Sequence, residues 1–141
     1  MRLEIDLNGE PNVVCFGSQG LRVKDPTQNL RPEVEYYLRR LAGRELSARV
    51  HELATLHGVE VERVSIRNQR SRWGSCSRSG TVSLNWRLVQ TPEFVRDYII
   101  LHELAHFKEM NHSARFWREV GRLCPDFVQA QQWLKANKLD R

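Results

Sequence analysis

Four residues in the C-terminal half of the chain have the types and the spacing that metal chemistry requires. His102 and His106 are four positions apart, and Glu103 directly follows the first of them. On an α-helix, two residues at this spacing lie on one face with their Cβ atoms about 5–6 Å apart, so both imidazoles can bind one Zn²⁺. Glu103 then lies about 100° round the helix. From there its carboxylate can take a proton from metal-bound water.

A third histidine completes this set. His112 lies six positions beyond His106 and would be roughly 9 Å further along the axis if the helix continued. The chain must therefore leave the helix between Lys108 and His112. Asn111 suits this break because asparagine tolerates the left-handed conformation found just past helix ends, and Ser113 can cap the next helix. Three protein ligands leave a fourth position open, so the sequence predicts one catalytic Zn²⁺ per chain.

The residues around the motif indicate a buried helix. Residues 94–107 are apolar on nearly all sides, which is typical of a helix inside the core. Imidazoles and a carboxylate on such a helix need partners, because burying them unpaired is costly. A metal ion and its bound water would supply those partners. Glu119, one helix further on, is the alternative to His112 as third ligand.

Composition predicts one small cytoplasmic domain. A chain of 141 residues is long enough to bury a single core. Its three cysteines, Cys15, Cys76 and Cys124, are odd in number and too widely spaced for a disulfide framework, which favours a reducing compartment. No apolar run reaches the ~20 residues of a membrane span, and the first residues contain no secretion signal. We expect a cytoplasmic monomer with no membrane contact.

The charge is basic and is carried mainly by arginine. The net charge is +5 at pH 7 and the pI is about 9.5. Six arginines lie close together in the chain: Arg63, Arg67, Arg70, Arg72, Arg78 and Arg87. Arginine binds carboxylates and phosphates through two hydrogen bonds at once, so an acidic substrate or a nucleic acid is one interpretation. A solvated basic surface is the other.

The expected elements run from a β-rich start to a helical end. Alternating apolar residues from Leu3 to Leu7, then 13–16 and 21–23, predict short strands. Pro32 opens a long helix that continues to about His57. Extended chain follows at 59–73, a loop at 74–80 and a strand at 81–88. Thr91 is expected to cap the metal-binding helix, and two more helices should run from Ser113 to just before Pro125 and over 126–136.

The strand at 81–88 offers a surface for substrate. Its apolar residues, beginning with Val82 and Leu84, alternate with polar ones and should face the core, while Asn85 and Arg87 should face outward. As an edge strand beside the metal it could align an extended peptide by backbone pairing, with arginines gripping a carboxylate or an oxyanion. Alternatively, the tryptophans are core residues and the arginines are solvated. The candidate substrate-binding residues are Arg70, Arg72, Trp73, Asn85 and Arg87.

Cys15 suggests a form of latency. A thiolate is a good zinc ligand. If the N-terminal segment folds over the cleft, Cys15 would occupy the fourth metal position and hold the protein inactive.

Four short motifs carry a specific family resemblance. They are Ser71-Arg72-Trp73-Gly74-Ser75-Cys76, Val82-Ser83-Leu84-Asn85-Trp86-Arg87, His102-Glu103-Leu104-Ala105-His106, and Asn111-His112-Ser113 with Phe116-Trp117. Together they resemble the YgjP-like metallopeptidase family, bacterial and archaeal proteins described as predicted metal-dependent hydrolases. The resemblance covers residues 32–135. More distantly, the His-Glu-x-x-His motif is similar to that of SprT-like and WLM-type proteases, which degrade proteins crosslinked to DNA.

The resemblance implies a small α+β domain of the zincin type. In such a domain an active-site helix and a backing helix pack on a small sheet whose edge strand borders the cleft. It also implies zinc at His102, His106 and His112, with Glu103 as general base. We therefore expect a short N-terminal β segment and connector at residues 1–28 and a zincin-like metallopeptidase domain at 29–141.

Three function classes follow from these residues. The first is a zinc metallopeptidase that acts on peptides or proteins, with Glu103 activating the zinc-bound water. The second is a metal-dependent nuclease of the three-histidine type, which would suit the basic charge. Nucleases of the YbeY type lack the glutamate after the first histidine, so Glu103 favours the peptidase. The third is a catalytically silent metal-bearing binding module, which an intact Glu103 also disfavours.

Overall fold

The structure is a computed structural model that describes residues 4–5, 13–16, 19–22 and 31–139. The chain divides into two compact units, Met1–Arg40 and Leu41–Arg141. The division falls within the first long helix. The predicted boundary after residue 28 lies outside the described residues and stays a prediction.

The first unit contains a small antiparallel sheet. Its strands are β1 (Glu4–Ile5), β2 (Val13–Phe16) and β3 (Gln19–Arg22), in the order β1-β2-β3. Val14 pairs with Ile5 on one side and with Leu21 on the other. Short strands were predicted at these three places.

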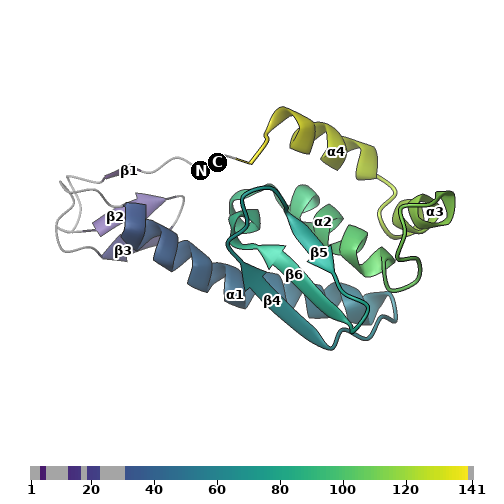
Figure 1. Cartoon of the computed structure of the whole chain (residues 1–141). Coiled ribbons are helices and arrows are strands. Elements are labelled where there is room, and N and C mark those ends of the chain that lie inside the picture. Colours follow the sequence, from purple (N-terminus) through teal and green to yellow (C-terminus); the bar gives the residue numbers. More distant parts are fainter. Residues whose placement is uncertain (1–3, 6–12, 17–18, 23–30, 140–141) are drawn as a thin grey trace. The chain divides into compact units, whose positions relative to one another are not determined.

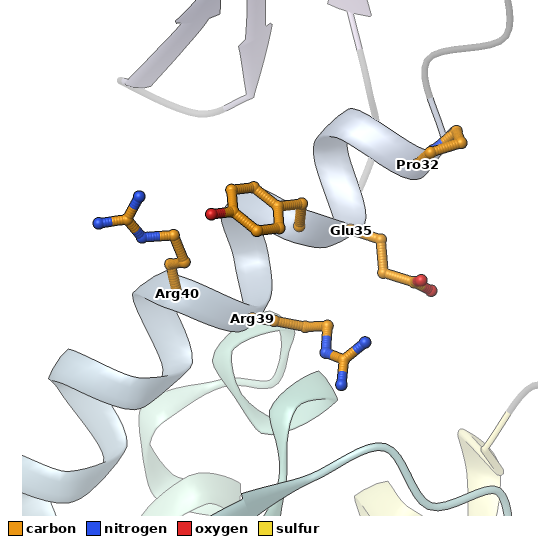
Figure 2. Close-up of a pocket in the computed structure, with 5 residues that line it drawn as sticks. Pro32, Glu35, Arg39 and Arg40 are labelled. Carbon is orange, nitrogen blue, oxygen red and sulfur yellow. The ribbon is translucent and has the colours of Figure 1, made fainter.

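Helix α1 (Arg31–Leu56) runs from the first unit into the second. It begins next to Pro32, whose fixed φ suits a first helical turn, and ends within a residue of the predicted position. A cavity of about 490 Å³ opens beside its first turns; its lining residues are Pro32, Glu35, Tyr36, Arg39 and Arg40. Figure 2 shows the labelled side chains projecting from the helix. These lining residues include no histidine or cysteine, so they offer no soft metal ligands.

The second unit contains a three-stranded mixed sheet. Its strands are β4 (Arg63–Arg67), β5 (Gly74–Cys76) and β6 (Thr81–Asn85), in the order β4-β6-β5. Strand β4 pairs with β6 in parallel and β5 pairs with it antiparallel, so β5 is an edge strand.

The predicted loop at 74–80 was wrong in its first half. Gly74–Cys76 is a strand, and the turn is confined to the residues before Gly80, whose φ is +94°. The Gly80 N–H donates to the Ser77 carbonyl at 3.1 Å, which closes the turn. A three-residue strand is too short to show an alternating pattern, so local sequence did not reveal it.

Strand β6 ends earlier than predicted. Val82 and Leu84 are fully buried, as expected, and so is Leu88. Leu88, however, lies in a 3₁₀ helix, η1 (Trp86–Gln90), because the Asn85 side-chain oxygen accepts a hydrogen bond from the Arg87 N–H and caps this helix. The prediction that Asn85 faces outward was wrong: its side chain is completely buried.

Asn85 ties down the connection between β4 and β5, which we call the crossover segment (residues 68–73). The Asn85 side-chain amide donates to the carbonyls of Gln69 at 2.6 Å and Arg72 at 2.9 Å. Its backbone N–H donates to the Trp73 carbonyl at 2.9 Å. Both polar atoms of its side chain are therefore bonded inside the protein. This structural role leaves no side-chain group for the substrate contact that we had expected.

The two residues after Asn85 hold the same segment. Trp86 is buried, and its indole N–H donates to the Asn68 side-chain oxygen at 3.1 Å. The Arg87 guanidinium lies 4.6 Å from the centre of the Trp86 ring and donates to the Gln69 carbonyl at 3.1 Å. Arg87 therefore stabilises the crossover segment. Its guanidinium, which we had expected to bind substrate, instead donates to the Gln69 carbonyl.

Three helices complete the second unit: α2 (Glu93–Ala105), α3 (Ala114–Leu123) and α4 (Phe127–Ala136). Ser113 caps α3 as predicted, since its side chain accepts from the Phe116 N–H at 3.3 Å. Thr91 does not cap α2. Its hydroxyl donates to the Leu88 carbonyl at 2.7 Å and closes η1 instead.

Helix α2 is the centre of this unit. It contacts α3, α4, β5 and β6 (Figure 1). The second half of α1 is linked to it by Arg49, whose guanidinium binds both oxygens of Asp97 at 2.9 and 2.8 Å. The fold is α+β, as predicted. Among the described residues, none of the helices has the length and apolar character needed to cross a membrane.

Replacing Asn85 by alanine should destabilise the protein. Asn85→Ala removes the side-chain donor to the Arg72 carbonyl and one of the two side-chain donors to the Gln69 carbonyl, which keeps Arg87. An unsatisfied buried polar group costs about 1–3 kcal/mol. We expect the free energy of unfolding, measured by urea denaturation, to fall by that amount.

Gly43→Ala is the matched control, because a Cβ at this helical position would meet nothing within 4 Å. It should raise the free energy of unfolding by about 0.5–1 kcal/mol, since glycine is a poor helix former. Unchanged stability in Asn85→Ala would contradict the role given to Asn85.

Candidate metal centre

The three predicted histidines lie together. The ring nitrogens of His102, His106 and His112 are all within 4.8 Å of one another. His102 lies on α2, His106 is the C-cap residue of that helix, and His112 lies on the connection to α3. His106 is buried, His102 is half-buried and His112 is exposed, so the cluster is open to solvent on the His112 side.

The end of α2 brings His112 back to the other two. The chain leaves the α-helix at His106, earlier than the predicted break after Lys108. The N–H groups of His106, Phe107 and Lys108 bond three residues back, to the carbonyls of 103, 104 and 105, at 3.1–3.2 Å. Such 3₁₀ bonds tighten the last turn of a helix. The tightened turn lets the chain reverse toward the metal cluster within a few residues.

Hydrogen bonds orient two of the imidazoles. His106 Nδ1 lies 3.1 Å from the Glu109 carbonyl, which can only accept, so Nδ1 carries the proton and Nε2 has a free lone pair. His102 Nδ1 lies 3.4 Å from the Tyr98 hydroxyl, and Gln131 of α4 donates to that hydroxyl at 3.2 Å. When Nδ1–H of His102 donates to the Tyr98 oxygen, its Nε2 is also free. Partners of this kind are typical of metal-binding histidines.

Sequence reasoning treated Tyr98 only as an apolar core residue. It lies one helical turn before His102, on the same face of α2, and this spacing was the available signal. Gln131 had no such signal, because it is far away in the sequence and reaches Tyr98 only through the packing of α4.

Phe116 of α3 is a common support for the three rings. It is fully buried and stacks on His106 with ring centres 4.4 Å apart. Its ring centre is also 4.9 Å from those of His102 and His112. These contacts fix the ring planes, so the cap at Ser113, which begins α3, also determines how the metal cluster is supported.

Glu103 lies beside the cluster. Its side chain is nearly buried, and its Oε1 is 4.0 Å from His106 Nε2. Burial raises the pKa of Glu103 to about 7, and the positive charge of Arg72 opposes this rise. A carboxyl group with a pKa near neutrality is well suited to accept and return a proton.

Strand β5 lies directly against Glu103. A Cβ at Gly74 would be 3.3 Å from Glu103 Cγ and 3.2 Å from both the Ser83 carbonyl and a Leu84 methyl group. Only glycine lets the strand approach this closely without displacing a neighbour.

The histidines are kept in the neutral form that binds metal. Burial, together with the neighbouring His106 and His112, lowers the pKa of His102 to about 4. Burial also lowers the pKa of His106. Two of the three imidazoles are therefore uncharged at neutral pH before any metal binds.

The histidine cluster is exposed in a cavity of about 430 Å³. This volume is within the range of small-molecule binding pockets. The lining residues of the cavity are Arg72, Gly74, Ser75, Cys76, His102, Glu103, His106, Met110 and His112. All of β5 is among them. Burial, with the charge of Glu103, raises the pKa of Cys76 to about 11, so its thiol is protonated at neutral pH.

Of the five residues expected to bind substrate, only Arg72 lines this cavity. Arg70 is exposed and Trp73 is half-buried outside it, whereas Asn85 and Arg87 hold the crossover segment. Glu119 is not among the clustered ligands: its carboxylate binds Arg122 and, at 3.4 Å, Lys108. The side chain of Cys15 is outside the described part of the chain.

Solved structures include two similar metallopeptidases. The chain resembles the metallopeptidase zymogen of Pyrococcus abyssi abylysin, with 24% identity and a TM-score of 0.57 over 67% of this chain and 97% of that one. It also resembles the metallopeptidase zymogen of Methanocaldococcus jannaschii jannalysin, with 27% identity and a TM-score of 0.53 over 64% and 96%. A comparison with curated proteins gave no match.

The family comparison covers nearly the whole chain. Residues 1–137 match the family model described as the YgjP-like metallopeptidase domain, a longer stretch than the 32–135 over which the motifs resembled it. With its three clustered histidines and adjacent carboxylate, the protein is a metal-dependent hydrolase and belongs to the YgjP-like metallopeptidase family.

Proposed function

We propose that the protein is a zinc-dependent peptidase in which His102, His106 and His112 bind the metal and Glu103 is the general base. The observation that supports this most directly is the ligand geometry. Three ring nitrogens lie within 4.8 Å of one another, and the Glu103 carboxylate is 4.0 Å from one of them.

The donor set fits zinc. Zinc in catalytic sites is held by three protein ligands at about 2.0–2.2 Å, and imidazole nitrogen is one of its usual donors. The partners at Tyr98 and Glu109 leave Nε2 of His102 and His106 available for a shared ion. When bound, zinc supplies Lewis-acid chemistry by polarising a carbonyl oxygen and lowering the pKa of water.

The chain's own residues would carry the proton. In the buried position of Glu103, its carboxylate can take a proton from the attacking water and later give it to the leaving amine. The free edge of β5 borders the same cavity, so it can bind an extended substrate through backbone hydrogen bonds. Gly74 keeps this edge in contact with Glu103, which places the bound peptide beside the base.

The two alternatives receive less support. A three-histidine nuclease has no need of a buried glutamate directly beside the ligands. A silent binding module has no need of the open cavity that exposes Glu103. The family and both structural neighbours are metallopeptidases, which favours peptide or protein as the substrate.

We further propose that the protein folds in a latent form. Both structural neighbours are described as zymogens, and Cys15 offers a thiolate that could occupy the fourth zinc position. Strand β2 holds the backbone of Cys15 in the N-terminal sheet. In this proposal, activation requires the Cys15 thiolate to leave the metal position.

Removing any one of the three histidines should weaken zinc binding. His102→Ala, His106→Ala and His112→Ala each delete a ligand, so the loss of affinity should exceed the roughly 10–100-fold caused by losing a ligand's hydrogen-bond partner. Zinc affinity can be measured by competition with a chelator. Glu119→Gln is the control and should keep its zinc. If His112→Ala kept full affinity and Glu119→Gln lost it, the third ligand would be Glu119.

Glu103→Gln should separate metal binding from catalysis. The amide keeps the shape of the side chain but cannot accept the proton, so kcat for a peptide substrate should fall by about 10²–10⁴-fold while zinc content stays normal. Glu109→Gln is the matched control, since only the backbone of Glu109 contacts His106. Wild-type turnover in Glu103→Gln would rule out the proposed general base.

Cys15→Ser should raise the activity of the full chain if the thiolate blocks the metal. The expected result is a higher kcat/KM with unchanged zinc content, measured on freshly purified protein without an activation step. Cys124→Ser is the control, because this half-buried residue does not line the cavity. Equal activity in wild type and Cys15→Ser would remove Cys15 from any latency mechanism.

A further inference from the structure

The segment that forms the sheet of the second unit contains basic side chains but no acidic ones. Residues 63–92 contain six arginines and no aspartate, glutamate or lysine. The whole chain has 22 basic and 17 acidic residues, so elsewhere the two signs nearly balance. The excess positive charge of the protein is therefore concentrated on this sheet and its connections.

Most of these arginines form no ion pair with the residues that the structure describes. Arg87 is used to hold the crossover segment. The other five are exposed, and none forms an ion pair with a residue in the described part of the chain: Arg63, Arg67, Arg70, Arg72 and Arg78. By contrast, helix arginines such as Arg49 and Arg96 do pair with carboxylates. The sheet thus presents guanidinium groups that are free to bind an external anion.

Two of the five flank the strand that borders the metal cavity. Arg72 lies two residues before β5 and lines the cavity itself. Arg78 lies two residues after β5, in the turn that leads to β6. At about 3.3 Å per residue, the three residues of β5 border roughly three residues of an extended peptide, and Arg72 and Arg78 lie two residues beyond its two ends. One arginine therefore lies toward each end of a peptide paired with β5.

We propose that β5, with Arg72 and Arg78 at its two ends, selects extended peptides that carry acidic side chains on both sides of the cleaved bond. This inference rests on the proposed peptidase function and names its substrate class. Guanidinium groups bind carboxylates through paired, charge-assisted hydrogen bonds. Glu103 is the only acidic residue among those that line the cavity, and it is buried, so an acidic substrate meets little repulsion.

A peptide fits this surface better than a nucleic acid does. The free edge of β5 offers backbone N–H and C=O groups in the pattern that pairs with another strand, and a phosphate backbone has no N–H groups to complete that pattern. The aromatic residue next to this edge, Trp73, is half-buried, whereas stacking of unpaired bases requires accessible rings.

The test uses the zinc-loaded full chain and matched peptides. A quenched fluorescent peptide with a single cleavable bond is made with glutamate on both sides of that bond, and again with glutamine or with lysine. We expect kcat/KM to be about tenfold higher for the glutamate peptide than for the glutamine peptide, and the difference to shrink with added salt. Exposed charge pairs contribute only a small free energy each, so Arg72→Gln and Arg78→Gln should each reduce this preference about 1.4- to fivefold.

Charge reversal makes the test independent of general damage to the protein. Arg78→Glu should prefer the lysine peptide over the glutamate peptide, which a merely unfolded or unstable variant cannot do. Arg63→Gln is the matched control, because it removes the same charge from β4, at the opposite edge of the sheet. It should keep the preference of the wild type.

Two results would overturn the inference while leaving the peptidase intact. One is equal kcat/KM for glutamate and glutamine peptides. The other is that peptides show no charge preference, while a single-stranded oligonucleotide competes with peptide and binds more weakly to Arg72→Gln and Arg78→Gln. Such a result would mean that the arginines bind phosphate. Cleavage of none of the peptides would instead overturn the proposed function, and the inference with it.

Discussion

Three imidazole nitrogens must meet at one point, and a single straight helix can supply only two of them. His102 and His106 use one face of α2, so the third ring has to come from chain that has left the helix. The 3₁₀ bonds at residues 106–108 make the helix end at once, and the Ser113 cap starts α3 soon after. Phe116, in the first turn of α3, then contacts all three rings. The end of one helix and the start of the next are thus both needed to bring the three histidines together.

The proposed general base, Glu103, depends on a second constraint, which is the close approach of β5 to its side chain. Glu103 is uncharged more readily than an ordinary glutamate because it is buried, and part of that burial comes from β5. The absence of a side chain at residue 74 lets the strand lie this close to the Glu103 side chain without displacing its neighbours. Gly74 therefore contributes to the burial of Glu103, although glycine has no functional group of its own. Asn85 matters in a similar way, since it acts only through the carbonyls of the crossover segment.

Much of this centre could be predicted from sequence, because its signals are local. The spacing of His102 and His106 follows from the pitch of a helix, and the Ser113 cap and the long α1 follow from ordinary helix-end rules. What failed depended on contacts between distant residues. Strand β5 exists through its pairing with β6, and the inward position of Asn85 depends on the crossover segment. Thr91 closes η1 instead of capping α2, because its hydroxyl donates to the carbonyl of Leu88. The alternating pattern had predicted a strand at Leu88, where the structure has a 3₁₀ helix.

The histidine cluster and the proposed substrate-binding edge of β5 are positioned by different parts of the fold. The histidines depend on α2, on the turn after it and on Phe116 of α3. The edge strand and Arg72 depend on β6, through Asn85 and its neighbours. The two sets meet where Gly74 touches Glu103. Carboxylates near the first set, such as Asp97 and Glu119, are paired with basic side chains, whereas the exposed arginines of the sheet and its connections form no ion pair with the described residues. If the proposed peptide site is right, substitutions on the sheet should therefore alter which peptides bind while the ligand geometry stays the same. Such a division lets substrate preference change without rebuilding the metal site.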